Sequence, residues 1–176
     1  MKVEATSLPG VLRIEPDVYE DERGFFLETF RAERYAEHGI PTAFAQDSLS
    51  FSRKGVLRGL HLQWPSAQGK LVWVLEGEVF DVAVDLRTRQ WEGHTLSGEN
   101  RHQIWIPPGL AHGFVVTGES ALFAYKCTGA YDPASELAVR WNDPDLGIEW
   151  PIAEPILSSK DAAAPPLAEI DPARLP

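Results

Sequence analysis

The sequence predicts an all-β sandwich or barrel, and three observations lead to this fold class. Short runs rich in β-branched and aromatic residues recur along the chain, Gly, Pro and Asn separate them, and only one segment has clear helical spacing. The chain has 176 residues, enough for one domain with a sizeable core and short for two. We therefore expect a single domain over residues 1–176, with a tail at 162–176 that wraps the surface or frays.

The one predicted helix lies near the N-terminus, in the segment RAERYAEHG at residues 31–39. Ala32, Tyr35 and Ala36 repeat there at helical spacing, and Gly39 is placed to end the helix. His38 falls within the same segment.

The segment GVLRGLHLQW, residues 55–64, is typical of a buried strand, yet an arginine and a histidine interrupt its leucines. Simple alternation puts Arg58 and His61 on opposite faces. Gly59 lies between them, and a glycine inside a strand often marks a bulge, which shifts the alternation by one residue. We therefore predict that Arg58 and His61 line one cavity.

Several more strands follow. In LVWVLEGEVFDVAVDL, residues 71–86, two β-rich runs meet at Glu76-Gly77, which predicts a hairpin. Alternation divides the second run between two faces, one with Phe80, Val82, Val84 and Leu86, the other with Val79, Asp81, Ala83 and Asp85. Turn-forming residues bound three further strands, QIWIP, HGFVV and ALFAYKC.

Composition limits the class of protein. Hydrophobic residues make up 44%, and no apolar run approaches the roughly 18 residues that a membrane-spanning helix needs. The N-terminus MKVEATSLPG lacks the apolar core of a secretory signal, and Cys127 is the only cysteine, so we expect a cytoplasmic protein. The net charge of −10 argues against non-specific nucleic-acid binding but leaves room for a local basic pocket that binds a small anion.

Two histidines are candidates for chemistry, and each also has a structural interpretation. His61 is either a core residue satisfied by Gln63 or a backbone carbonyl, or a functional group. Pro107, Gly109 and His112 form a P-x-G-x-x-H pattern that resembles the second motif of cupin barrels. The first metal-binding cupin motif begins His-x-His, whereas Leu62 and Gln63 follow His61, so the usual three-histidine metal site is missing.

Several more polar residues are ambiguous by themselves. Lys70 is either a solvated strand end or a cation that faces the same cavity as His61. Tyr125 is a common type of strand residue, and Arg23 precedes a glycine in what reads as a turn. Lys160 and Asp161 read as an exposed pair near the C-terminus.

Seven blocks in order resemble the dTDP-4-dehydrorhamnose 3,5-epimerase family: DERGFFLETF, GVLRGLHLQ, GKLVWVLEGEVFDVAVDLR, LSGENRHQIWIPPGLAHGF, YKCTGAYDPASE, WNDPDLGIEWP and LSSKDAAAPPL. The resemblance runs from about residue 8 to residue 167. It implies a cupin-type double-stranded β-helix, a jelly-roll barrel with a short N-terminal helix and minor helical elements. It also implies a homodimer, no metal or organic cofactor, and inversion at carbons 3 and 5 of a dTDP-linked 4-keto-6-deoxy sugar.

The resemblance assigns catalytic roles to four residues. His61 matches the family's catalytic base, and Asp161 matches the carboxylate that pairs with it, which places the two within hydrogen-bonding reach. Lys70 matches the residue near the keto oxygen, where its charge stabilises an enolate. Tyr125 matches the general acid that returns a proton from the opposite face.

The resemblance also assigns substrate-binding residues. Arg23, Arg58 and Lys160 match contacts to the nucleotide sugar, and Tyr131 matches an aromatic that stacks on thymine. Further binding positions, of which several come from the partner subunit in the family, are matched by Glu28, Gln46, Asp47, Ser48, Lys70, His112 and Glu136.

The sequence departs from the family in places and leaves more than one function open. The segment DLRTRQWEGHTL is shorter than the family loop, Ser48 replaces an asparagine, and Ala130 stands where an aromatic commonly precedes Tyr131. A C3-only or C5-only epimerase of a related dTDP sugar fits the same base. A metal-dependent cupin enzyme rests only on P-x-G-x-x-H, and a non-catalytic nucleotide-sugar-binding module is the third competing hypothesis.

Overall fold

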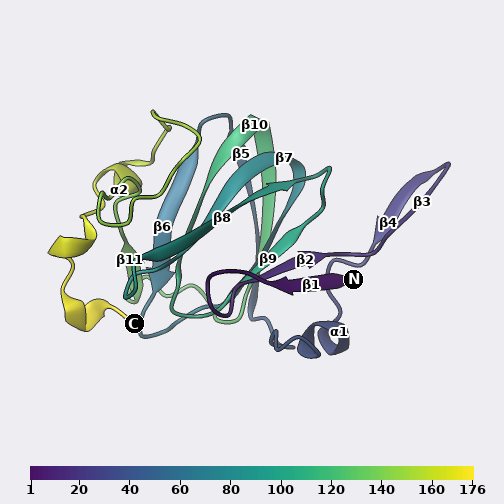
Figure 1. The fold of residues 1–176 in the computed structure, drawn as a ribbon, viewed down its shortest axis with the longest axis horizontal. Helices are drawn as coiled ribbons and strands as arrows, with labels where there is room; N and C mark the ends of the chain where they lie inside the picture. The colour runs from purple at the N-terminus through teal and green to yellow at the C-terminus, as the bar shows by residue number, and fades with distance from the viewer.

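The chain folds into two facing β-layers, and a computed structural model describes all of its residues, 1–176 (Figure 1). Every pairing between its strands is antiparallel. One layer is built from β8 (Gln90–Ser97), half of β7 (Lys70–Asp85), half of β10 (Ala111–Cys127), β6 (Leu57–Gln63) and β11 (Glu136–Ala138). The other contains β5 (Gln46–Arg53), the remaining halves of β10 and β7, β9 (Gln103–Ile106), β2 (Leu12–Glu15) and β1 (Lys2–Ala5). The predicted jelly-roll fold class is confirmed.

The two long strands β7 and β10 pass from one layer to the other, and the predicted hairpin at Glu76-Gly77 is therefore wrong. Gly77 has a φ of +82°, and a Cβ there would lie 1.8 Å from the carbonyl oxygen of Ser120 on β10. The glycine thus marks a bend pressed against the neighbouring strand, where the pairing of β7 with β10 shifts register between Val116 and Ala121. The predicted strands HGFVV and ALFAYKC are likewise two parts of β10.

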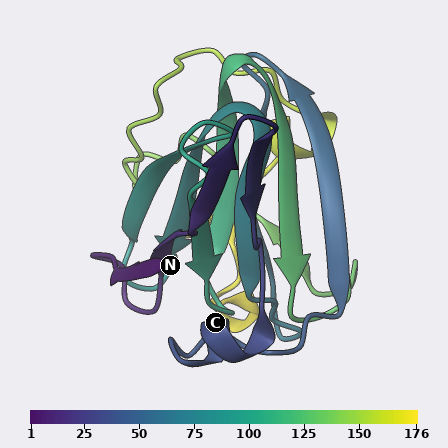
Figure 2. The ribbon, with the colours of Figure 1, turned by 90° about the vertical axis from the view of Figure 1, so that its right-hand side faces the viewer.

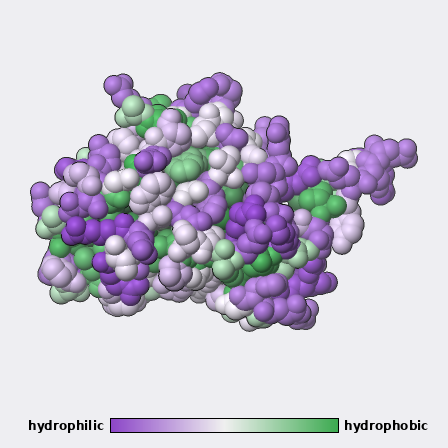
Figure 3. Space-filling model, viewed as in Figure 1, coloured by the Kyte–Doolittle hydropathy of each residue, from purple (hydrophilic) through white to green (hydrophobic).

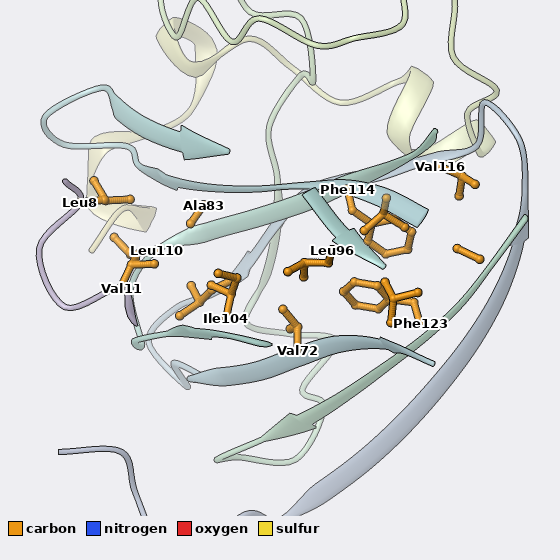
Figure 4. Close-up of a cluster of buried hydrophobic side chains, with 14 residues drawn as sticks. Leu8, Val11, Val72, Ala83, Leu96, Ile104, Leu110, Phe114, Val116 and Phe123 are labelled. Carbon is orange, nitrogen blue, oxygen red and sulfur yellow. The ribbon is translucent and has the colours of Figure 1, made fainter. Parts of the chain in front are cut away.

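The main hydrophobic core fills the space between the layers (Figure 4). It contains 14 buried residues, among them Val72, Phe114 and Phe123. The predicted alternation in the second half of β7 is confirmed, because Val79 and Ala83 belong to this cluster while Val82 and Val84 belong to the cluster on the outside of the layer. The inner side chains of both halves of β7 and of β10 thus contribute to one core.

The C-terminal segment covers the outside of the layer that contains β6. A cluster of 11 buried residues lies there, and it includes Leu167 and Ile170 from the tail. Two short 3₁₀-helices, η1 (Leu167–Glu169) and η2 (Pro172–Arg174), carry the tail across this surface. The tail residues Leu167 and Ile170 therefore pack against this layer.

The predicted N-terminal helix is confirmed as α1 (Ala32–Ala36), which packs on the outside of the other layer. Its Tyr35 is buried, and the hydroxyl donates to Gln103 Oε1 at 2.7 Å. Gly39, with a φ of +78°, follows the helix, and His38 lies in the turn rather than in the helix. None of the helices has the length and apolar composition needed to span a membrane.

A two-stranded arm, β3 (Val18–Asp21) and β4 (Gly24–Leu27), projects from the body of the molecule (Figure 1). Three of its large side chains are exposed, Tyr19 by 62%, Phe25 by 57% and Phe26 by 67%. Figure 3 shows hydrophilic surface at the tip of the arm and hydrophobic surface near its base. Exposed aromatic side chains on a projecting element are typical of an interaction surface.

Candidate active site

Arg58 and His61 line one cavity of about 390 Å³, as predicted. Three residue steps on β6, from Arg58 to His61, oppose two on β10, from Phe114 to His112, so β6 carries the expected bulge. Gly59 makes the bulge possible because its φ is +140° and because a Cβ there would lie 2.5 Å from Gly113 Cα. We call this space the main cavity. It is lined by Ser50, Val56, Leu57, Arg58, His61, Lys70, His112, Phe114, Phe123, Tyr125, Ile156, Leu157, Ser158, Lys160 and Asp161.

His61 and Asp161 meet at the wall of the main cavity, although 100 positions separate them in the sequence. His61 Nε2 lies 2.5 Å from Asp161 Oδ1, within the hydrogen-bonding reach expected for this pair. The C-terminal segment reaches β6 because Leu57 N donates to Ile156 O at 3.0 Å and Ile156 N donates to Gly55 O at 2.8 Å. A short helix, α2 (Ser159–Ala162), then carries Asp161 into place.

Asp161 is buried, with 4% exposure, whereas its local sequence alone predicts an exposed residue. Ser158 caps α2 by accepting from Asp161 N at 3.1 Å, and its hydroxyl donates to Asp161 Oδ2 at 2.9 Å. Burial by itself raises the pKa of Asp161, but the hydrogen bonds from His61 and Ser158 outweigh it and lower the pKa below the ordinary value. The carboxylate therefore stays ionised and can orient His61 and stabilise its protonated form.

Lys70 begins β7 and faces the main cavity together with His61, so it is not a solvated strand end. Burial lowers the pKa of Lys70, because the ammonium loses water, while the nearby Cys127, Asp81 and Glu136 oppose that shift. A poorly hydrated cation in a cavity stabilises an anionic oxygen more strongly than a cation in water does.

Two polar side chains of β10, Tyr125 and His112, also face the main cavity. Tyr125 packs beside Phe123, with 6.0 Å between the ring centroids. His112 is buried, and its Nε2 lies 2.8 Å from Oδ2 of the buried Asp81. The Asp81 carboxylate therefore holds the His112 ring in one orientation toward the cavity.

A smaller hollow of about 140 Å³, which we call the side pocket, shares His61, Lys70 and Tyr125 with the main cavity. Gln46, Gln63, Gln68, Tyr131 and Glu136 complete most of its wall. The Tyr131 hydroxyl donates to Glu136 Oε2 at 2.8 Å, and Lys160 forms an ion pair with Glu136 Oε1. This hydrogen bond to Glu136 raises the pKa of Tyr131.

Some residues assigned by resemblance do not reach the main cavity within one chain. Arg23 lies on the arm, 85% exposed at its side chain, and pairs with Asp21. Glu28 is 3.2 Å from Arg34, and Asp47 is 2.9 Å from Lys126 on the outer side of β5. Ser48 lines neither the main cavity nor the side pocket and accepts a hydrogen bond from Gln46 at 2.9 Å.

Sequence reasoning missed several residues of the site. Asp81 sits in the expected inward row of β7, and a carboxylate among buried Val79 and Ala83 was a usable signal. Ser158 stands three residues before Asp161, the spacing of a helix cap. The apolar wall formed by Ile156 and Leu157 gave no signal, because only the pairing of this segment with β6 brings it there.

The arrangement can carry out proton transfer at a carbon beside a carbonyl. It combines a histidine oriented by a carboxylate, a buried cation and a tyrosine hydroxyl around one space. No group of three or more His, Cys, Asp or Glu side chains is positioned to hold a metal ion.

Comparisons with known proteins identify the family of the chain. The family model described as dTDP-4-dehydrorhamnose 3,5-epimerase matches residues 5–169. A dTDP-4-dehydrorhamnose 3,5-epimerase from Salmonella typhimurium is 53% identical over 94% of this chain and 94% of its own length. One of the same name from Neisseria gonorrhoeae is 49% identical over 99% of this chain, which spans 55% of that relative.

A solved structure gives the same result. The crystal structure of dTDP-6-deoxy-D-glucose-3,5-epimerase from Legionella pneumophila, in complex with dTDP-4-keto-L-rhamnose, is 53% identical, with a TM-score of 0.96. The likeness covers 99% of this chain and 97% of that one. The chain therefore belongs to the dTDP-4-dehydrorhamnose 3,5-epimerase family of isomerases.

Proposed function

We propose that the chain converts dTDP-4-dehydro-6-deoxy-D-glucose into dTDP-4-dehydro-L-rhamnose, a reaction of dTDP-L-rhamnose biosynthesis, by inverting carbons 3 and 5. The observation that carries the proposal is the grouping of His61, Lys70 and Tyr125 around one cavity. Carbons 3 and 5 both flank the ketone at carbon 4, so a proton on either is acidic enough to be removed when the enolate is stabilised.

The proposed reaction has two proton transfers at each carbon. His61 takes the proton at Nδ1, because its Nε2 is already hydrogen-bonded to Asp161. The electron pair of the broken C–H bond moves into the enolate, whose negative oxygen interacts with the Lys70 ammonium. Asp161 holds the His61 ring, and its ionised state favours the imidazolium that forms. Tyr125 then donates its hydroxyl proton from the opposite face of the ring, which inverts the centre.

Binding residues are proposed on the same basis. The guanidinium of Arg58 suits diphosphate oxygens, and Ser52 Oγ accepts from its Nε at 2.9 Å, which orients it. Tyr131 is 54% exposed beside the side pocket, so its ring is available for stacking on thymine. Lys160 and Glu136 form an ion pair at this edge. His112, held by Asp81, and Gln46 complete the proposed contacts.

We further propose that the enzyme acts as a homodimer in which each arm extends the partner's site. The arm carries Arg23 away from its own main cavity, and Glu28 and Asp47 also lie outside it. Exposed apolar side chains occur on the arm and on the outer side of β5, where Leu49 is 59% exposed and Phe51 61%. Burial of these surfaces would stabilise a dimer.

The test is incubation with dTDP-4-dehydro-6-deoxy-D-glucose in heavy water, followed by proton NMR. The proposal expects deuterium at carbons 3 and 5 and an L-configured product, and His61→Ala provides the inactive control. Exchange at one carbon only would indicate a mono-epimerase, whereas dTDP binding without exchange would indicate a binding module. Stoichiometric Fe, Mn or Zn whose removal abolishes turnover would instead support a metal-dependent cupin enzyme.

A further inference from the structure

The inner side of β5 carries a row of four polar side chains, Gln46, Ser48, Ser50 and Ser52, which we call the inner β5 row. Alternation turns these residues toward the interior, and the residues between them are exposed. β5 lies at the edge of its layer beside β10 (Figure 2). The inner β5 row therefore forms a polar margin beside the strand that carries Tyr125.

Three members of the inner β5 row have hydrogen-bond partners within the protein. Gln46 Nε2 donates to Ser48 Oγ at 2.9 Å, and Gln46 Oε1 accepts from Tyr131 N at 2.9 Å. Ser52 Oγ accepts from Arg58 Nε at 2.9 Å.

Ser50 is the exception in this row. Its Oγ is buried and has no hydrogen-bond partner, although the residue lines the main cavity. A buried hydroxyl without a partner destabilises a folded protein, so such groups usually have a partner in the functional state. Because Ser50 lines the cavity, rotation about its χ1 can turn the buried hydroxyl toward a ligand there, and a ligand is then the natural partner.

The register of β5 with β10 fixes the position of Ser50 along the cavity. Ser48 stands opposite Tyr125, and Ser50 opposite Phe123, one step of the inner row further along. The next member, Ser52, holds Arg58. Ser50 therefore lies between the proposed proton donor to the sugar and the proposed ligand of the diphosphate.

We propose that the Ser50 hydroxyl binds the β-phosphate, the phosphate that carries the sugar, by donating a hydrogen bond to one of its oxygens. This inference rests on the proposed function, because the sugar must face Tyr125 and the diphosphate must face Arg58. A neutral hydroxyl suits this position, since it satisfies an oxygen beside Arg58 without adding charge near His61 and Tyr125. Ser50 is thus a substrate-binding residue outside the set assigned by resemblance.

The experiment compares Ser50→Ala with wild type in the full chain, with Ser120→Ala as the matched control. Ser120 lies on β10, outside both the main cavity and the side pocket. Calorimetry with dTDP and with dTMP separates the phosphates, because dTMP lacks the β-phosphate. Ser50→Ala should bind dTDP about tenfold more weakly, the loss expected for one hydrogen bond to a charged group, and should bind dTMP as wild type does. Ser120→Ala should match wild type with both ligands.

Stability gives a second readout that a structural role would not produce. Removal of an unpaired buried hydroxyl should leave the melting temperature of the ligand-free protein unchanged or raise it. Unchanged dTDP affinity, equal losses for dTDP and dTMP, or a lowered melting temperature would each overturn the proposal. Binding and melting temperature are measured without turnover. A failure of the Ser50 proposal can therefore be distinguished from a failure of the proposed function, which is tested by turnover of wild type.

Discussion

Gly59→Ala tests how the backbone of β6 builds the site. The substitution forces an L side chain into a φ of +140° and brings its Cβ to 2.5 Å from Gly113 Cα and 3.0 Å from His112 O. Backbone strain of this kind costs about 1–2 kcal/mol, and overpacking against a neighbouring backbone costs about 1–3 kcal/mol. The free energy of unfolding should therefore fall by about 2–5 kcal/mol, as measured by urea denaturation. Because the bulge also aims Arg58 and His61 into one cavity, kcat/KM should fall too.

Gly55→Ala is the matched control for this variant. Gly55 also has a positive φ, +78°, but a Cβ there meets nothing within 4 Å. Gly55→Ala should therefore lower the free energy of unfolding by the backbone strain alone, about 1–2 kcal/mol, and should keep its activity. If Gly59→Ala were no less stable than Gly55→Ala and equally active, the close approach of β6 and β10 would not be what shapes the cavity.

Two further predictions concern the ionisable groups of the site. Asp161→Asn should lower kcat/KM on the order of 10²-fold at pH 7, because His61 loses the charge that orients it. Because folding lowers the pKa of Asp161, ionised Asp161 stabilises the folded protein above pH about 4, and this stabilisation is lost as the pH falls through the pKa of the folded state. In urea titrations the unfolding free energy of the Asn variant should therefore fall less steeply with acid than that of wild type. An identical pH profile would contradict the pairing of Asp161 with His61. Lys70→Met should lower kcat by about 10²–10³-fold, because the enolate loses its cation. The unfolding free energy should stay equal or rise, because the substitution removes a poorly hydrated charge. Retained turnover would exclude Lys70 as the enolate ligand.

The fold class and part of the cavity followed from local patterns. The bulge at Gly59 could be predicted because a glycine between two polar residues of a strand commonly marks an irregular pairing. The same signal misled at Gly77, where a glycine between two strand-like runs marks a bend against Ser120 rather than a hairpin. A glycine in a strand-like run therefore predicts an irregular backbone conformation, but whether it is a bulge, a bend or a turn depends on the neighbouring strand.

Contacts between distant segments could not be derived from local patterns. Asp161 reads as exposed in isolation, and only the pairing of Ile156 with β6 buries it beside His61. The resemblance supplied this pair. For Arg23 and Glu28 the resemblance was not enough. It assigns both residues to substrate binding, but within a single chain neither reaches the main cavity.

The central claim is that two different groups act on opposite faces of the sugar, and Tyr125→Phe tests it most directly. The substitution keeps the ring that packs beside Phe123 and removes only the hydroxyl. In heavy water the variant, incubated with dTDP-4-dehydro-6-deoxy-D-glucose, should still exchange deuterium into the sugar, because His61 can remove a proton and return a deuteron from the same face. It should form little L-configured product, with inversion slowed on the order of 10²–10⁴-fold, whereas His61→Ala should lose exchange and inversion together. Inversion of carbon 5 by Tyr125→Phe at the wild-type rate would contradict the account.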